Sequence, residues 1–172
     1  RRCPDKGYEC KHMAKEKLKH LVSKEAFNID GLGKKVIHNF WDLNMIKYPS
    51  DIFDLNFKKI SSLEGWGELS ASNLEKAIKS SQKVPLEKLI FAIGIRHIGQ
   101  ENAKTLAKYF VSIKKFIKLF DREKRKKILN YLLELDGIGE TQVNSLETFF
   151  SNSSNLNTVS NLIKELNVTD FK

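Results

Sequence analysis

The chain has 172 residues, of which 41% are apolar and 30% are charged, with 30 Lys and Arg against 21 Asp and Glu. This composition supports a buried core, argues against a disordered chain, and leaves room for one domain or two small ones. The longest apolar stretch, 89–95, is much shorter than the roughly 20 residues that cross a bilayer, so no membrane partner is expected and the location is predicted to be cytoplasmic.

Cysteine and charge are distributed unevenly along the chain. The only cysteines, Cys3 and Cys10, both lie within the first ten residues, so no disulfide framework can hold the rest of the chain together. Net charge is +5 over residues 1–48, +1 over 49–100, +7 over 101–132 and −4 over 133–172. Basic blocks of this kind favour polyanions such as nucleic acid, although a solvated lysine-rich surface explains them equally well.

Eight of the nine glycines fall at four sites, each between two apolar segments. The shared pattern is an apolar residue, any residue, glycine, an apolar residue, glycine, and then apolar positions four and seven residues later. In chain order it occupies 29–40, 63–74, 95–106 and 135–146, with His97 in place of the first glycine in the third copy. A repeat with a spacing of 32 to 40 residues predicts four copies of one supersecondary unit.

Helix periodicity gives the internal structure of each copy. The apolar residues after the second glycine lie on one helical face, so a second helix is expected to begin at the hairpin; these pairs are Ile37 and Phe40, Ala71 and Leu74, Ala103 and Leu106, and Val143 and Leu146. Apolar residues upstream predict a first helix or turn. The apolar residue between the glycines is expected to point back between the helices; it is Leu32, Trp66, Ile98 or Ile138. The predicted fold is all-α, with four tandem helix-hairpin-helix units in a compact arc.

Each predicted hairpin places backbone N–H groups at a helix N-terminus, where an anion is favoured. Hairpins one, two and four are expected to contact phosphate through the backbone, whereas the third, with His97 in place of a glycine, is expected to depend on the Arg96 side chain. Glycines without side chains let a phosphodiester approach the main chain, and such contacts carry no base information. Sequence-independent DNA binding is therefore expected, with Lys34, Lys35, Arg96 and Lys104 adding attraction. The glycines expected at the interface are Gly31, Gly33, Gly65, Gly67, Gly99, Gly137 and Gly139. A tight turn without ligand is the alternative for any single copy.

Two segments outside the hairpins are also interpreted. His97 is expected to be a polar turn residue rather than a catalytic one, since no matching acid or nucleophile is near it. The basic run 122–127 is interpreted as a solvated linker, with an extension of the DNA-binding surface as the alternative. The Ser- and Asn-rich tract 151–161 is expected to connect the fourth unit to a last short helix, 159–166.

Two strings in the chain, HLVSKEAFNIDGLGKK at 20–35 and GIRHIG at 94–99, closely resemble the C-terminal half of bacterial NAD-dependent DNA ligase. The likeness runs in order through 1–168. It implies the remnant of a zinc module and a connecting helix at 1–22, the four-hairpin DNA-binding domain at 23–150, and a linker with a short helix at 151–172 that leads toward a BRCT domain.

The resemblance also implies cofactors and a division of labour. Cys3 and Cys10 match the third and fourth ligands of the family's four-cysteine zinc site, so this chain has half a site and zinc is expected to bind weakly or not at all. NAD and Mg belong to the parent's catalytic domain. The adenylation motif Lys-x-Asp-Gly is absent, because Asn28 and Glu134 stand where the lysine would be. The chain is therefore expected to be inactive alone and to hold duplex DNA, nicked in the reaction, beside the parent's adenylation, OB and BRCT domains.

Other classes remain open at this point. A tandem-hairpin adaptor of the junction-binding or excision-repair type would also bind DNA, but it would not be expected to carry the two cysteines or the string at 94–99. A protein-interaction scaffold would not bind DNA at all. A hairpin glycosylase is disfavoured, since no Asp with a nearby Lys nucleophile follows Gly139.

Overall fold

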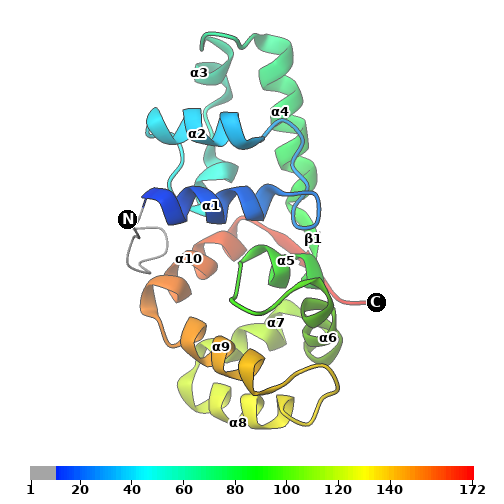
Figure 1. Ribbon diagram of the computed structural model, residues 1–172. Helices are drawn as coiled ribbons and strands as arrows, with labels where there is room; N and C mark the ends of the chain where they lie inside the picture. Colours follow the sequence, from blue (N-terminus) through cyan, green and yellow to red (C-terminus); the bar gives the residue numbers. More distant parts are fainter. Residues whose placement is uncertain (1–10) are drawn as a thin grey trace. The chain divides into compact units, whose positions relative to one another are not determined.

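The computed structural model describes residues 11–172, so the predicted metal ligands Cys3 and Cys10 lie outside the described residues. The chain divides into two compact units, one ending at Lys83 and the other beginning at Val84. Each unit contains two of the four glycine sites. Figure 1 follows the chain through both.

The first unit is made of helices on either side of the first two hairpins. Its elements are α1 (Lys11–Val22), α2 (Lys34–Asp42), the 3-10 helix η2 (Pro49–Asp54), α3 (Phe57–Ser61) and α4 (Glu68–Ser81). Phe40 of α2 is fully buried, and its ring lies 5.7 Å from the ring of Trp66 in the second hairpin. The two hairpins of this unit therefore share one core.

The second unit contains the third and fourth hairpins. Its elements are β1 (Lys83–Pro85, at the boundary), α5 (Leu86–Ala92), α6 (Gln100–Phe110), α7 (Ile113–Phe116), the 3-10 helix η3 (Ile117–Phe120), α8 (Arg122–Leu132), α9 (Glu140–Phe150), α10 (Ser153–Lys164) and β2 (Asn167–Thr169). The ring of Phe116 lies 5.3 Å from that of Phe110 and 5.7 Å from that of Phe150. These aromatic contacts join α6, α7 and α9 into one core.

The all-α prediction is confirmed, and the helix periodicity located the core correctly. Most of the predicted pairs are buried, namely Ile37, Phe40, Ala71, Leu74, Ala103, Leu106 and Leu146, while Val143 is half-buried. The sequence did not predict the two three-residue strands, β1 and β2, which pair with each other. No helix within residues 11–172 is long and apolar enough to cross a membrane.

Two segments that were expected to be linkers are helical, each with a local side-chain cap and buried residues on one face. The basic run 122–127 is the start of α8, not a linker; Asp121 caps this helix by accepting a hydrogen bond from the N–H of Lys124 at 2.9 Å. The tract 151–161 is mostly the helix α10, because Asn152 caps its start and Val159 and Leu162 are buried on one face. Both segments are mostly polar, so composition alone did not indicate their capping residues or their buried residues.

Candidate nucleic-acid interface

The same backbone turn precedes the second helix of all four units. In each, the N–H of the apolar residue between the glycines donates to the carbonyl three residues earlier. These bonds are Leu32 to Ile29 at 3.3 Å, Trp66 to Leu63 at 3.0 Å, Ile98 to Ile95 at 3.1 Å and Ile138 to Leu135 at 3.2 Å. The predicted repeat is therefore a repeat of backbone structure as well as of sequence.

The residue before this apolar position has a positive φ in every copy. The values are 93° at Gly31, 84° at Gly65, 65° at His97 and 89° at Gly137. This left-handed conformation costs glycine little, whereas a Cβ penalises it. His97 thus occupies the place of the missing glycine and is exposed there, in agreement with its expected role as a polar turn residue.

The second glycine of each copy begins the second helix. Gly33, Gly67, Gly99 and Gly139 are the N-terminal boundary residues of α2, α4, α6 and α9, all with extended backbone. The N–H groups of the following first turn have no partner within the helix, and the helix dipole is positive at that end. All four helices therefore present main-chain donors at the hairpin.

Side chains already occupy part of this donor set in two hairpins. The N–H of Gly67 donates to Oγ of Ser70 at 2.9 Å, and the N–H of Gly139 donates to Oε1 of Gln142 at 3.0 Å. Among the described residues, no side-chain acceptor bonds the N–H of Gly33 or Gly99. The donors of the first and third hairpins are thus more open than those of the second and fourth, which differs from the expectation that the second and fourth offer free backbone donors and the third does not.

Charge separates the hairpins in the same way. The second and fourth carry a carboxylate in the turn and another in the first helical turn, at Glu64 and Glu68 and at Asp136 and Glu140. The first hairpin carries one exposed carboxylate in its turn, Asp30, but the first turn of α2 contains no acidic residue and begins with the exposed Lys34 and Lys35. The third hairpin has exposed Arg96 in its turn and one acid, Glu101, in the first turn of α6, where the Glu101 carboxylate lies 3.7 Å from Lys104. The predicted cations are therefore all in the first and third hairpins.

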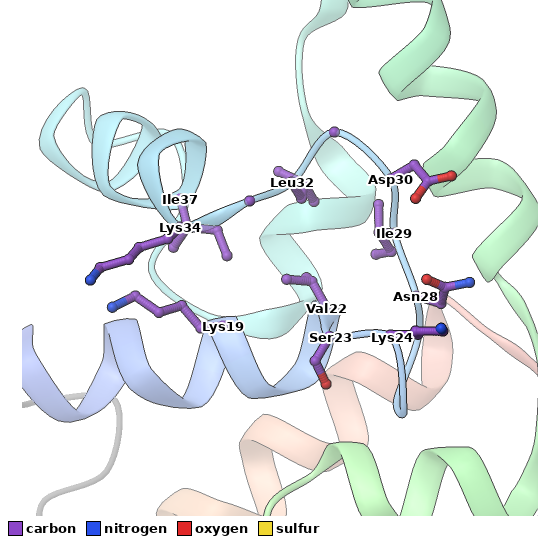
Figure 2. Close-up of a pocket in the computed structure, with 12 residues that line it drawn as sticks. Lys19, Val22, Ser23, Lys24, Asn28, Ile29, Asp30, Leu32, Lys34 and Ile37 are labelled. Carbon is purple, nitrogen blue, oxygen red and sulfur yellow. The ribbon is translucent and has the colours of Figure 1, made fainter.

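The first hairpin also forms a hollow of about 340 Å³ between α1 and α2. Three lysines line it, Lys19, Lys24 and Lys34, together with the carboxylate of Asp30. Figure 2 shows the ammonium ends of Lys19 and Lys34 extending toward the same side of the hairpin. Lys19 Nζ donates to Glu16 Oε1 at 2.9 Å, and this bond lowers the pKa of the Glu16 carboxyl. An anion on the side of Lys19 and Lys34 would meet these two cations and the open N–H groups of α2, while Asp30 also lines the hollow.

The apolar site residues have a different placement from the glycines. The side chains of Leu32, Ile98 and Ile138 are buried and Trp66 is half-buried, so they anchor the turns rather than face a ligand. The exposed part of each predicted site is the glycine backbone with its neighbouring polar residues. Within residues 11–172, no group of three His, Cys, Asp or Glu residues is placed to hold a metal ion.

The comparisons with known proteins agree with this geometry. A family model described as a helix-hairpin-helix motif matches residues 88–159, which include the third and fourth hairpins. Over 170 residues, 99% of this chain, the sequence is 47% identical to a DNA ligase of Pelagibacter ubique (strain HTCC1062), of which it covers 25%.

Two further relatives carry the same name. A DNA ligase of Ehrlichia canis (strain Jake) is 44% identical over 95% of this chain and 25% of its own length. A DNA ligase of Rickettsia bellii (strain OSU 85-389) is 38% identical over 99% of this chain and 26% of its own length. The chain thus spans about a quarter of the length of the curated relatives it matches.

Proposed function

We propose that this chain, whose sequence fits a C-terminal fragment of a DNA ligase, holds duplex DNA by its sugar-phosphate backbone. One observation carries the proposal. The same hydrogen-bonded turn, with a positive φ at its third residue, precedes a helix N-terminus four times. Because main-chain N–H groups bind phosphate oxygens without reading bases, the expected binding is independent of sequence.

Within this function, we assign the strongest grip to the first and third hairpins. Their second-glycine N–H groups are open, and their cations are exposed at Lys34, Lys35 and Arg96. The hollow beside the first hairpin adds Lys19 and Lys24. The second and fourth hairpins would then guide the duplex mainly through backbone donors, since their own side chains near the turn are acidic.

The role of the whole protein follows as part of the same proposal. The parent would be an NAD-dependent ligase that joins 3′-hydroxyl and 5′-phosphate ends at a nick during replication and repair. Its adenylation, OB and BRCT domains, with NAD and Mg in the catalytic domain, would supply the chemistry in the cytoplasm, while this chain places the DNA. Cys3 and Cys10 would give two of the four thiolates that a structural zinc site needs.

The decisive experiment measures affinity for nicked duplex DNA across a salt series by fluorescence anisotropy. Each phosphate contact contributes about 0.9 to the slope of log K against log salt, so the double variant Lys34→Gln/Lys35→Gln should lower this slope by about 2. The matched control is Lys76→Gln/Lys79→Gln, which removes two exposed lysines of α4 outside its first turn. Binding of the unsubstituted chain that ignores salt would contradict the proposal, as would equal effects of the two variants.

A further inference from the structure

An exposed basic surface lies outside the hairpin turns, on α7, η3 and α8. We call it the basic corner; its members are Lys114, Lys115, Lys118, Arg122, Lys124, Lys126 and Lys127, all exposed. Asp121 and Glu123 are the only acids between 113 and 127, and the Asp121 carboxylate accepts the capping bond of α8. No member of the basic corner lies within 4.0 Å of a carboxylate oxygen in the described part of the chain. Together with these two acids, the seven cations give this surface a net charge of +5.

This corner is held in shape by a buried cation of the same helix. Arg125 is only 4% exposed, and its guanidinium donates to Glu147 Oε2 at 2.8 Å and to the carbonyls of Leu119 and Phe150 at 3.1 and 3.2 Å. These bonds tie η3, α8 and the end of α9 together. The exposed cations therefore project from a fixed scaffold rather than from a loose tail.

Part of the basic corner lies on the solvent-facing side of α8. Lys124, Lys127 and Tyr131 follow at intervals of three and four residues, so they share one helical face, away from the buried Arg125 and Leu129. The Tyr131 side chain is 64% exposed. The cations of this face suit the phosphates of a nucleic-acid backbone, and Tyr131 is exposed beside them.

The corner is also continuous with the fourth hairpin. Helix α8 ends at Leu132, and the hairpin turn begins three residues later at Leu135, as the chain in Figure 1 shows. That hairpin has only carboxylates near its turn, Asp136 and Glu140, and the N–H of Gly139 is engaged by Gln142. A duplex seated on it needs a nearby source of positive charge, and α8 is the adjoining helix.

We propose that the basic corner is a second contact surface for the phosphates of duplex DNA and supplies the attraction that the fourth hairpin lacks. This inference rests on the proposed DNA-binding function but concerns residues outside the hairpins. It assigns a partner to Lys124, Lys126 and Lys127, which no hairpin geometry accounts for.

The test compares two triple variants of the chain by anisotropy with nicked duplex DNA across a salt series. Lys124→Gln/Lys126→Gln/Lys127→Gln removes three charges from the corner. Lys76→Gln/Lys108→Gln/Lys164→Gln removes three exposed charges elsewhere and serves as the matched control. The corner variant is expected to lower the salt slope by about 2 to 3 and to bind roughly tenfold more weakly near physiological salt, while the control stays near the unsubstituted chain. Replacement of the same three lysines by arginine should keep the slope, and thermal melts establish that all variants fold.

The other outcomes overturn the proposal in distinguishable ways. Equal losses in both triple variants would mean that net charge alone acts. A corner variant that binds like the unsubstituted chain, while Lys34→Gln/Lys35→Gln weakens binding, would overturn the corner and leave the hairpin function standing. If the unsubstituted chain shows no salt-dependent binding, both proposals fail. A corner variant that keeps DNA binding but loses polyglutamate binding would replace DNA by an acidic protein partner.

Discussion

The Nε atom of Arg125 donates to Oε2 of Glu147 across 2.8 Å, although Arg125 belongs to the most basic run of the chain. The guanidinium is buried, whereas the Glu147 side chain is about half exposed at 50%. The Arg125 Nη2 atom donates to Oε1 of the same carboxylate at 3.4 Å, and Nη1 donates to the carbonyls of Leu119 and Phe150. Arg125 is therefore part of the core, whereas its basic neighbours in the run are exposed to solvent.

Replacement of Arg125 by alanine should destabilise the second unit by about 2 to 4 kcal/mol. The change leaves two carbonyls without their donor and opens space around the aromatic core. Urea unfolding followed by circular dichroism measures the effect. The matched control is Lys126→Ala on the adjacent exposed position, which should stay within about 0.5 kcal/mol of the unsubstituted chain. A similar small change in both variants would show that the guanidinium bonds are not stabilising.

Substitutions at the two glycines of the second hairpin should affect different properties, stability at Gly65 and DNA binding at Gly67. Gly65 has a φ of 84°, and a Cβ added there would meet no atom within 4 Å, so Gly65→Ala carries backbone strain alone. We expect a loss of about 1 to 2 kcal/mol in unfolding free energy. Gly67 has an extended backbone and open space around it. Gly67→Val should therefore cost less stability but weaken DNA binding, because its branched side chain keeps phosphate away from the main chain.

Unfolding and anisotropy on both glycine variants give the answer. If Gly65→Ala is as stable as the unsubstituted chain, the positive φ at residue 65 does not require glycine. If Gly67→Val binds DNA normally, phosphate does not approach the backbone of this hairpin.

His97→Gly should stabilise the third hairpin. The left-handed conformation costs histidine about 1 to 2 kcal/mol relative to glycine. Because glycine is more flexible in the unfolded chain, the net gain in unfolding free energy is expected to be about 0.5 to 1 kcal/mol. The hydrogen bond from Asn102 Nδ2 to the His97 carbonyl, 3.0 Å long, involves only the backbone of residue 97 and survives the change. Thermal unfolding tests this, with Arg96→Gly as the control that should give no gain. A destabilised His97→Gly chain would be the contrary result.

Neutralising the acids of the second and fourth hairpins should raise affinity for DNA. Glu68→Gln/Glu140→Gln removes two carboxylates from first helical turns where phosphate would lie, so we expect binding several-fold tighter at low salt. A small loss of stability accompanies it, since acids favour a helix N-terminus by about 0.3 to 1 kcal/mol each. Glu75→Gln/Asp170→Asn removes two acids away from the hairpins and serves as control. Equal affinity gains in both would point to net charge rather than to position.

The positions of the hairpins could be predicted because backbone geometry leaves a direct mark in the sequence. A positive φ favours glycine, and Gly31, Gly65 and Gly137 stand where it occurs. His97 breaks the glycine pattern, yet the repeat spacing still placed it correctly. The buried helix faces followed from spacing for a similar reason, since a residue such as Leu74 or Leu106 repeats with the helical turn.

Features set by single contacts could not be predicted in the same way. Ser70 and Gln142 engage glycine N–H groups because each stands three residues after the second glycine. That spacing is typical of a capping side chain, but by itself it does not decide whether the glycine N–H is capped or free to bind a ligand. The helical state of 122–127 and 151–161 depended on Arg125, Val159 and Leu162 meeting distant partners, which composition does not reveal.

The shared hairpin turn has a consequence for how this chain can vary. Its shape depends on one main-chain hydrogen bond and one positive φ, and the apolar residue that follows the positive φ is buried in three copies and half-buried in the second. Apart from the residue with positive φ, the exposed residues of the turn and of the following helical turn can therefore differ in charge between copies while the loop keeps its shape, from Lys34 and Lys35 in the first copy to Glu140 in the last. Four copies of one turn therefore carry different charges on the same main-chain path, and under the proposed function this would make the contact with DNA stronger at some hairpins than at others.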